Sequence, residues 1–207
     1  GFSELIAISA DLKASPSMAC LNIDGIVGAN LMHRAFWKID FTLNELSFQS
    51  APFNLSDSLY KIPFETKSTF TPVVNLNLDN KVISYVTFDS GSSGFLSIGG
   101  KKMSGSWKKE EHRDSWGYHS SGLFGSKKDS LTFQMFEFKI GNIEGFDAIC
   151  KIENQKSKAL LGIKFMENYD VYLDWEKNEV SLDPIKKFKQ RNTSYGFGPK
   201  ITTDDML

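Results

Sequence analysis

The sequence contains few of the residues that mark common metal and cofactor sites. Its 207 residues include two cysteines and three histidines, with no paired Cys-x-x-Cys motifs and no His-Glu-x-x-His motif. We therefore predict no zinc site and no cofactor. The Lys and the spacing of a phosphate-binding loop are missing, and no Gly-x-Ser-x-Gly turn is present, so phosphoryl transfer and serine hydrolysis are not indicated.

Strong charge and long hydrophobic runs are also missing. The formal net charge is -1, which offers no electrostatic case for nucleic acid as a partner. No apolar stretch approaches the roughly 20 residues that a membrane-spanning helix needs, so we predict no membrane span in this chain. Cys20 and Cys150 are expected to be buried free thiols, and a disulfide between them is possible but not indicated.

What the sequence does contain favours a globular, mainly β protein. Hydrophobic residues make up 41% and aromatic residues 13% of the chain, with 17 Phe, a composition typical of packed strands. Alternating apolar residues predict strands that are separated by turn residues such as Asp79-Asn80 and Gly141-Asn142. The predicted strands and hairpins cover residues 4–10, 18–23, 37–48, 60–64, 73–78, 81–88, 131–140 and 146–152.

The most informative motif is Asp89-Ser90-Gly91-Ser92-Ser93-Gly94, which follows an apolar run over residues 82–88. A carboxylate at the end of a strand, followed by a hydroxyl residue and glycines, is expected on a tight loop where main-chain N–H groups hold it. About seventy residues later the chain contains the box Leu160-Leu161-Gly162. An Asp-Ser-Gly alone is often only a turn, but the later box makes a catalytic carboxylate the better interpretation.

Together with the strand over residues 171–175, these motifs resemble one lobe of an aspartic protease, most closely the retropepsin-like and pepsin-like proteins of bacteria. The resemblance implies closed β-barrel lobes with short helices after the glycine boxes. It also implies that Asp89 is catalytic, that Ser90, Gly91 and Ser92 form the active-site loop, and that Gly28 and Gly162 are structural. Ser90 would bond across to the loop of a second lobe. The substrate would be a peptide or protein.

An internal repeat relates residues 24–48 to residues 158–182 with a constant offset of 134. Two similar hairpins would explain part of this match, but six identities in register favour a duplicated lobe. The identical pairs are Gly28/Gly162, Met32/Met166, Asp40/Asp174, Asn44/Asn178, Glu45/Glu179 and Ser47/Ser181. The counterpart of Asp89 would then fall before Gly1, so a missing N-terminal half-lobe or a homodimer partner is expected to supply the second carboxylate.

The repeat gives the expected domain organisation. We assign residues 1–50 to the C-terminal part of a first protease lobe, 51–59 to a linker, and 60–184 to a second lobe with the Asp-Ser-Gly loop. Residues 185–207 would form a basic linker or tail that leads to an absent PDZ domain, by analogy with some bacterial relatives.

Residues 99–128 are polar and rich in glycine. They are expected to form either a flap over the substrate, with Tyr118 and Gly122 near its tip, or a surface loop whose aromatic residues pack back on the barrel.

The function predicted from these observations is aspartic endopeptidase activity, in which two carboxylates activate water, with the present piece inactive alone. The alternative is a non-catalytic module of the same fold that binds extended peptides by strand addition. The resemblance also implies an exported protein, in the periplasm or at the cell surface.

Overall fold

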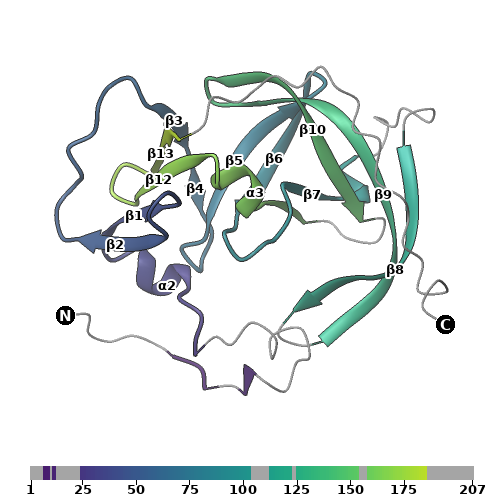
Figure 1. Ribbon diagram of the computed structural model, residues 1–207, viewed down its shortest axis with the longest axis horizontal. Helices are drawn as coiled ribbons and strands as arrows, with labels where there is room; N and C mark the ends of the chain where they lie inside the picture. Colours follow the sequence, from purple (N-terminus) through teal and green to yellow (C-terminus); the bar gives the residue numbers. More distant parts are fainter. Residues whose placement is uncertain are drawn as a thin grey trace.

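A computed structural model describes residues 7–9, 11–12, 24–103, 112–122, 125–153 and 158–185. The described elements are almost all strands, which confirms the mainly β fold class (Figure 1). In chain order they are α2 (Ala29–Met32), β1 (Phe36–Asp40), β2 (Glu45–Gln49), β3 (Tyr60–Pro63), β4 (Glu65–Thr66), β5 (Pro72–Leu78), β6 (Lys81–Phe88), β7 (Leu96–Gly99), the 3-10 helix η2 (Gly100–Lys102), β8 (His112–Gly122), β9 (Gly125–Ile140), β10 (Ile143–Glu153), β11 (Ala159–Leu161), α3 (Ile163–Met166), β12 (Tyr169–Asp174) and β13 (Glu179–Pro184).

Six strands close into a barrel in the order β5, β6, β11, β7, β10, β9 and back to β5. Two pairs are parallel, β6 with β11 and β7 with β10, and the others are antiparallel. The antiparallel β5–β6 hairpin turns at Asp79 and Asn80, both of which have positive φ, as a two-residue hairpin turn requires. The predicted closed barrel is therefore confirmed.

Alternating apolar residues of the barrel strands fill its interior. On β9 the even-numbered residues Phe136, Phe138 and Ile140 are buried, while Met135 is exposed. The same cluster continues into α3 and the sheet beside it through residues such as Phe165 and Tyr169, whose rings are 5.4 Å apart. One core therefore joins the barrel to the C-terminal helix and hairpin.

The second sheet has five strands in the order β2, β1, β12, β13, β3. Its two hairpins, β1–β2 and β12–β13, meet at its centre, where β1 and β12 pair antiparallel. Figure 1 shows β2 at the outer border of the molecule, with α2 next to it. The chain between this hairpin and β3, residues 51–59, contains no helix or strand.

The sequence repeat corresponds to a structural repeat. The helices α2 and α3 are related by the same offset of 134, and each follows a glycine with similar backbone angles, φ -99° at Gly28 and -103° at Gly162. Both hairpins share one register, because Ile39 pairs with Leu46 as Leu173 pairs with Val180. Their turns end on asparagines with positive φ, 56° at Asn44 and 52° at Asn178.

The pairing of β1 with β12 shows how the two copies are arranged. Lys38 lies opposite Tyr172, its own counterpart in the repeat, and Trp37 lies opposite Leu173 as Ile39 lies opposite Val171. Lys38 thus faces its own counterpart, Trp37 faces the counterpart of Ile39, and Ile39 faces the counterpart of Trp37. This exchange is the pattern of a two-fold axis between Lys38 and Tyr172.

Three parts of the prediction differ from the structure or lie outside it. Residues 112–122 and 125–130 form strands rather than a loop, and their long hairpin projects from the barrel (Figure 1). The helix after the first glycine box, expected from the resemblance over residues 29–34, ends at Met32. The strand predicted over residues 18–23, Cys20, and the tail from residue 186 lie outside the described residues, as does most of the strand predicted over residues 4–10.

Candidate active site

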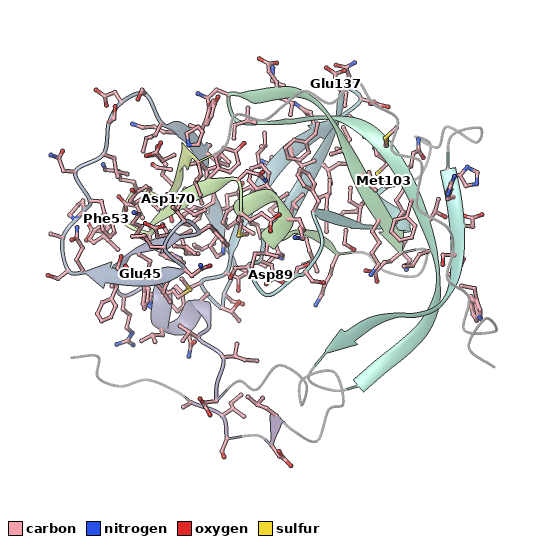
Figure 2. All side chains as sticks on the ribbon, viewed as in Figure 1. Glu45, Phe53, Asp89, Met103, Glu137 and Asp170 are labelled. Carbon is pink, nitrogen blue, oxygen red and sulfur yellow. The ribbon has the colours of Figure 1, made fainter. Side chains whose placement is uncertain are left out.

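Asp89 follows directly after β6, and its loop connects two strands that are not neighbours. The loop leads from β6 to β7, and β11 lies between those two strands and pairs with both. The strand β11, which follows Asp89 by about seventy residues in the chain, thus lies beneath the loop. Figure 2 shows Asp89 at the border of the barrel, on a turn between the strands.

Main-chain hydrogen bonds fix the loop to this inserted segment. The Asp89 N–H donates to the Leu161 carbonyl (2.9 Å), and the Ile163 N–H donates to the Ser92 carbonyl (2.8 Å). Within the loop, the Ser92 N–H donates to the Asp89 carbonyl (3.1 Å). The predicted motif and the Leu-Leu-Gly box are therefore brought into direct contact.

The Asp89 carboxylate is oriented by its own loop. The Gly91 N–H donates to Asp89 Oδ1 (2.9 Å), which is the short Asx-type turn that Asp followed by Gly favours. The residue is partly exposed, and Ser90 is exposed. Asp89 thus offers an oriented carboxylate that water can reach, which is what a general base requires.

Gly162 packs under the loop so closely that no side chain fits there. A Cβ at this position would lie 2.3 Å from the Gly94 carbonyl oxygen and 2.6 Å from that of Ser92. Both obstructing atoms belong to the main chain and cannot move without moving the loop. This contact supports a structural role for Gly162, which stays a prediction.

Gly28, its counterpart, has no loop above it in the described part of the chain. A Cβ at Gly28 would lie 3.0 Å from the Asn30 side chain and meet no main-chain atom of the described residues. The two glycines have similar backbone angles, and each is followed by a four-residue helix. Among the described residues, only Gly162 lies beneath a loop. Asp24, which precedes Gly28, is exposed.

The predicted flap residues Tyr118 and Gly122 belong to β8, and Gly122 pairs with Gly125 of β9 near the end of this hairpin. Nothing in the described contacts connects them to Asp89, and the Tyr118 side chain lies outside the described residues. The role of a flap therefore stays a prediction for these residues.

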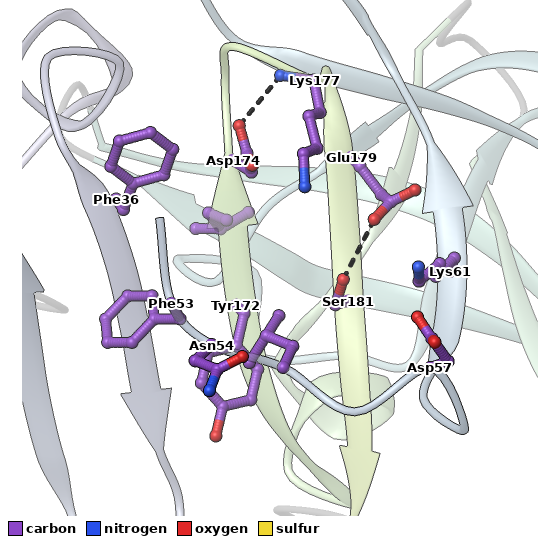
Figure 3. Close-up of a pocket in the computed structure, with 12 residues that line it drawn as sticks. Phe36, Phe53, Asn54, Asp57, Lys61, Tyr172, Asp174, Lys177, Glu179 and Ser181 are labelled. Atoms are coloured by element: carbon purple, nitrogen blue, oxygen red, sulfur yellow. Dashed lines mark hydrogen bonds between the residues drawn. The ribbon is translucent and has the colours of Figure 1, made fainter. Parts of the chain in front are cut away.

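A pocket of about 220 Å³ lies elsewhere, on the five-stranded sheet (Figure 3). It is lined by the 51–59 segment and by residues of β1, β3, β12 and β13, and Asp89 is not among them. Its polar groups are partly paired with one another, as Ser181 Oγ donates to Glu179 Oε1 (3.3 Å). We assign no chemistry to this pocket.

The sequence patterns did not single out Gln134, a buried polar residue of the barrel. The residue is 2% exposed, and neither of its side-chain amide atoms has a hydrogen-bond partner among the described residues. On the neighbouring strands it pairs with His112 and Cys150. The alternation of β9 would have placed Gln134 inward, because residues 132, 136 and 138 point the same way.

Among the described residues, no three His, Cys, Asp or Glu side chains are grouped so that they could hold a metal ion. The helices in the described part of the chain are too short to span a membrane. Cys150 is buried and unpaired, as predicted.

Comparisons with known proteins match this chain to solved structures and to no family model. No family model and no curated protein matches the chain. Among solved structures, a retropepsin-like aspartic protease from Rickettsia conorii is similar over 63% of this chain and 96% of its own length, with 14% sequence identity and a TM-score of 0.43. With a TM-score below 0.5, this likeness does not indicate a shared activity.

Proposed function

We propose that the chain is part of an aspartic endopeptidase and that Asp89 is one of its two catalytic carboxylates. The observation that carries the proposal is the contact between the Asp89 loop and the Leu161-Gly162 segment. There the loop and the segment beneath it are locked by main-chain bonds, and the carboxylate is oriented by Gly91. These residues keep a partly exposed carboxylate in a fixed position.

The proposed chemistry needs two such carboxylates. Two carboxyl groups within hydrogen-bond distance do not ionise together easily, so one stays protonated near the working pH. The ionised one then takes a proton from water as it attacks the peptide carbonyl, and the protonated one donates to the carbonyl oxygen. Asp89 would supply one of the pair, and Ser90 would bond to the loop that supplies the other.

The two-fold arrangement of the repeat supports a second loop over Gly28. We propose that residues 1–50 belong to a first lobe and residues 60–184 to a second, joined by the 51–59 linker. An equivalent Asp loop would then lie above α2 as the Asp89 loop lies above α3. Export and a downstream PDZ domain stay predictions from the resemblance.

The test uses the protein with all residues that its gene encodes before Gly1, assayed on an unfolded protein substrate between pH 3 and 7. Asp89→Asn should reduce cleavage by a factor of about 10³ or more, because one carboxylate cannot act as both acid and base. Asp57→Asn is the matched control, because it replaces an exposed carboxylate of the linker by the same amide. This substitution should leave cleavage unchanged.

Substantial cleavage by the Asp89→Asn protein that pepstatin does not inhibit would refute the proposal. If the wild-type protein binds extended peptides without cleaving them, the chain is instead a peptide-binding module. If the 207-residue chain cleaves by itself as a symmetric dimer, two copies of Asp89 form the pair.

A further inference from the structure

Lys38 lies at the two-fold axis of the repeat, where the second copy carries Tyr172 in its place. The two residues pair with each other across β1 and β12, and Lys38 Nζ is 5.7 Å from the centre of the Tyr172 ring. The first hairpin therefore places a positive charge at the junction between the two copies.

Lys38 binds a carboxylate from each hairpin. Its ammonium group donates to Asp40 Oδ2 (2.6 Å) on the same strand, and it lies 3.1 Å from Asp170 Oδ2 on β12. We call these two contacts the Lys38 bridge. The side chains of Lys38, Asp40 and Asp170 are 24%, 8% and 18% exposed, so water screens the bridge less than it screens a surface ion pair.

The strand pairing that the Lys38 bridge crosses is short. Three residue pairs join β1 to β12, with Lys38 in the middle, whereas five join β1 to β2 and six join β12 to β13. Trp37 is buried on the core side of the sheet, and Lys38 is on the opposite side because side chains alternate along a strand. Trp37 Nε1 also donates to the Met32 carbonyl (2.6 Å), which ties α2 to β1.

Further carboxylates lie on the neighbouring strands. In the strand register, Glu45 of β2 pairs with Asp40, and Asp183 of β13 pairs with Asp170. Asp170 Oδ1 is buried without a hydrogen-bond partner among the described residues. In that part of the chain, Lys38 is the one cation within ion-pair distance of Asp40 or Asp170, so it balances the charge of both.

We propose that the Lys38 bridge is an acid-sensitive junction that holds the first hairpin and α2 on β12 at neutral pH and loosens when its carboxylates are protonated. Protonation of Asp170 removes the ion pair between the hairpins, and protonation of Asp40 removes the pair within β1. Because the junction has three residue pairs, it should loosen while the six-stranded barrel stays closed. The inference goes beyond the proposed function and needs neither catalysis by Asp89 nor residues before Gly1.

The pH range follows from Asp40. The hydrogen bond from Lys38, together with the main-chain N–H of Leu43, lowers the pKa of the Asp40 carboxyl. A carboxylate whose pKa is lowered by folding contributes stability above its unfolded pKa, and this contribution is lost as the pH falls through the native pKa. The junction should therefore loosen below about pH 4. Lys38 stays charged and Tyr172 stays neutral in this range, because the hydrogen bond to Asp40 raises the pKa of Lys38 and burial raises that of Tyr172.

The experiment measures amide hydrogen exchange of the 207-residue chain at pH 6 and pH 2.5, as protection relative to an unfolded peptide at the same pH. In the wild type, protection of β1 and β2 should fall about tenfold more than that of β9 and β10 on acidification, as expected for the loss of a hydrogen bond between charged groups. Asp170→Asn keeps the size of the side chain and removes its charge. In this variant, protection of β1 should already be reduced at pH 6 and should fall less on acidification than in the wild type.

Lys38→Met should reduce the protection of β1 at pH 6 the most, because it leaves two shielded carboxylates without a cation. If this variant does not fold, the double variant of Lys38→Met with Asp170→Asn removes one of these charges and should be the more stable of the two. Lys164→Met is the matched control, since Lys164 forms an exposed ion pair with Glu167 (3.0 Å). It should keep the pH dependence of the wild type.

Equal protection of β1 at the two pH values in the wild type would overturn the proposal, as would the full wild-type pH dependence in Asp170→Asn. An equal loss of protection in β1 and in β9 and β10 would also overturn it, because acid would then unfold the whole chain rather than the junction. Asp89→Asn should behave as the wild type in this measurement, which separates the inference from the catalytic proposal.

Discussion

Cys150 shows how a single residue connects the barrel core to the pH dependence of stability. Its side chain is fully buried on β10, and this burial raises the pKa of its thiol far above the ordinary value. The native thiol therefore stays neutral at pH values where the thiol of an unfolded chain ionises. A group whose pKa is raised by folding contributes stability below its unfolded pKa and loses it as the pH rises.

We expect the free energy of unfolding to fall by about 1.4 kcal/mol between pH 7.5 and 9.5 through Cys150 alone, since the unfolded thiol titrates near pH 8.5. Urea unfolding under reducing conditions at both pH values, in a Cys20→Ala background, measures the change. Adding Cys150→Ala should remove this part of the pH dependence. An equal fall with and without Cys150 would show that other groups are responsible.

Which single residues matter could be read from the sequence only in part. Residue type and order singled out the Asp89 motif and Gly162, and the functional roles assigned to them stay predictions. The contact of Gly162 with the carbonyls of Ser92 and Gly94 depends on β11 lying between β6 and β7. A three-residue strand is too short for any sequence pattern to reveal it.

At the scale of elements, the turn residues of the two hairpins determine how their strands pair. Asp40 Oδ1 accepts the N–H groups of Thr42 and Leu43, and in the second hairpin Asp174 Oδ1 accepts the N–H of Lys177, the counterpart of Leu43. Each turn closes on an asparagine with positive φ. Each turn thus begins with an aspartate that accepts main-chain hydrogen bonds and ends with an asparagine that tolerates the left-handed region. Together these two residues fix the register of the hairpin.

Asn44→Val and Asn178→Val should therefore each destabilise the chain by about 1–2 kcal/mol, since a β-branched residue resists the left-handed conformation. Asn→Gly at the same positions should cost little, because glycine adopts it freely. Unfolding midpoints of the four variants test this. Equal midpoints for the Val and Gly variants at either site would mean that the backbone there is not held at positive φ.

Elements with alternating apolar residues and turn residues could be predicted from the sequence, and elements without these patterns could not. The β5–β6 hairpin has alternating apolar residues and Asp79-Asn80 at its turn, and it forms where predicted. The β8–β9 hairpin beyond the barrel includes residues 112–122, which are mostly polar. In residues 112–117, whose side chains the structure describes, β8 has no fully buried residue. A strand without a buried face lacks the alternation that marks a strand, so this segment was predicted as a flap or loop.

At the scale of the whole molecule, closure of the barrel depends on a short seam that local patterns do not encode. The paired residues of β5 and β9 are Asn77 with Lys139 and Leu78 with Phe138. Asp79 extends the seam, as its N–H donates to the Glu137 carbonyl (3.1 Å) and its Oδ1 accepts the Glu137 N–H (2.8 Å). Figure 2 labels Glu137 at the top of the barrel, where this seam lies.

Because the seam is short beside the ten-pair β9–β10 register, loss of one side-chain bond should open it measurably. Asp79→Gly keeps the positive φ available but removes the acceptor, so the Glu137 amide should exchange about fivefold faster, for a bond that contributes about 1 kcal/mol. Amides in the β9–β10 pairing should be unchanged. Asn80→Gly changes the adjacent turn residue, also at positive φ, and should leave the Glu137 amide protected. If both variants speed exchange equally, the turn itself rather than the Asp79 carboxylate holds the barrel closed.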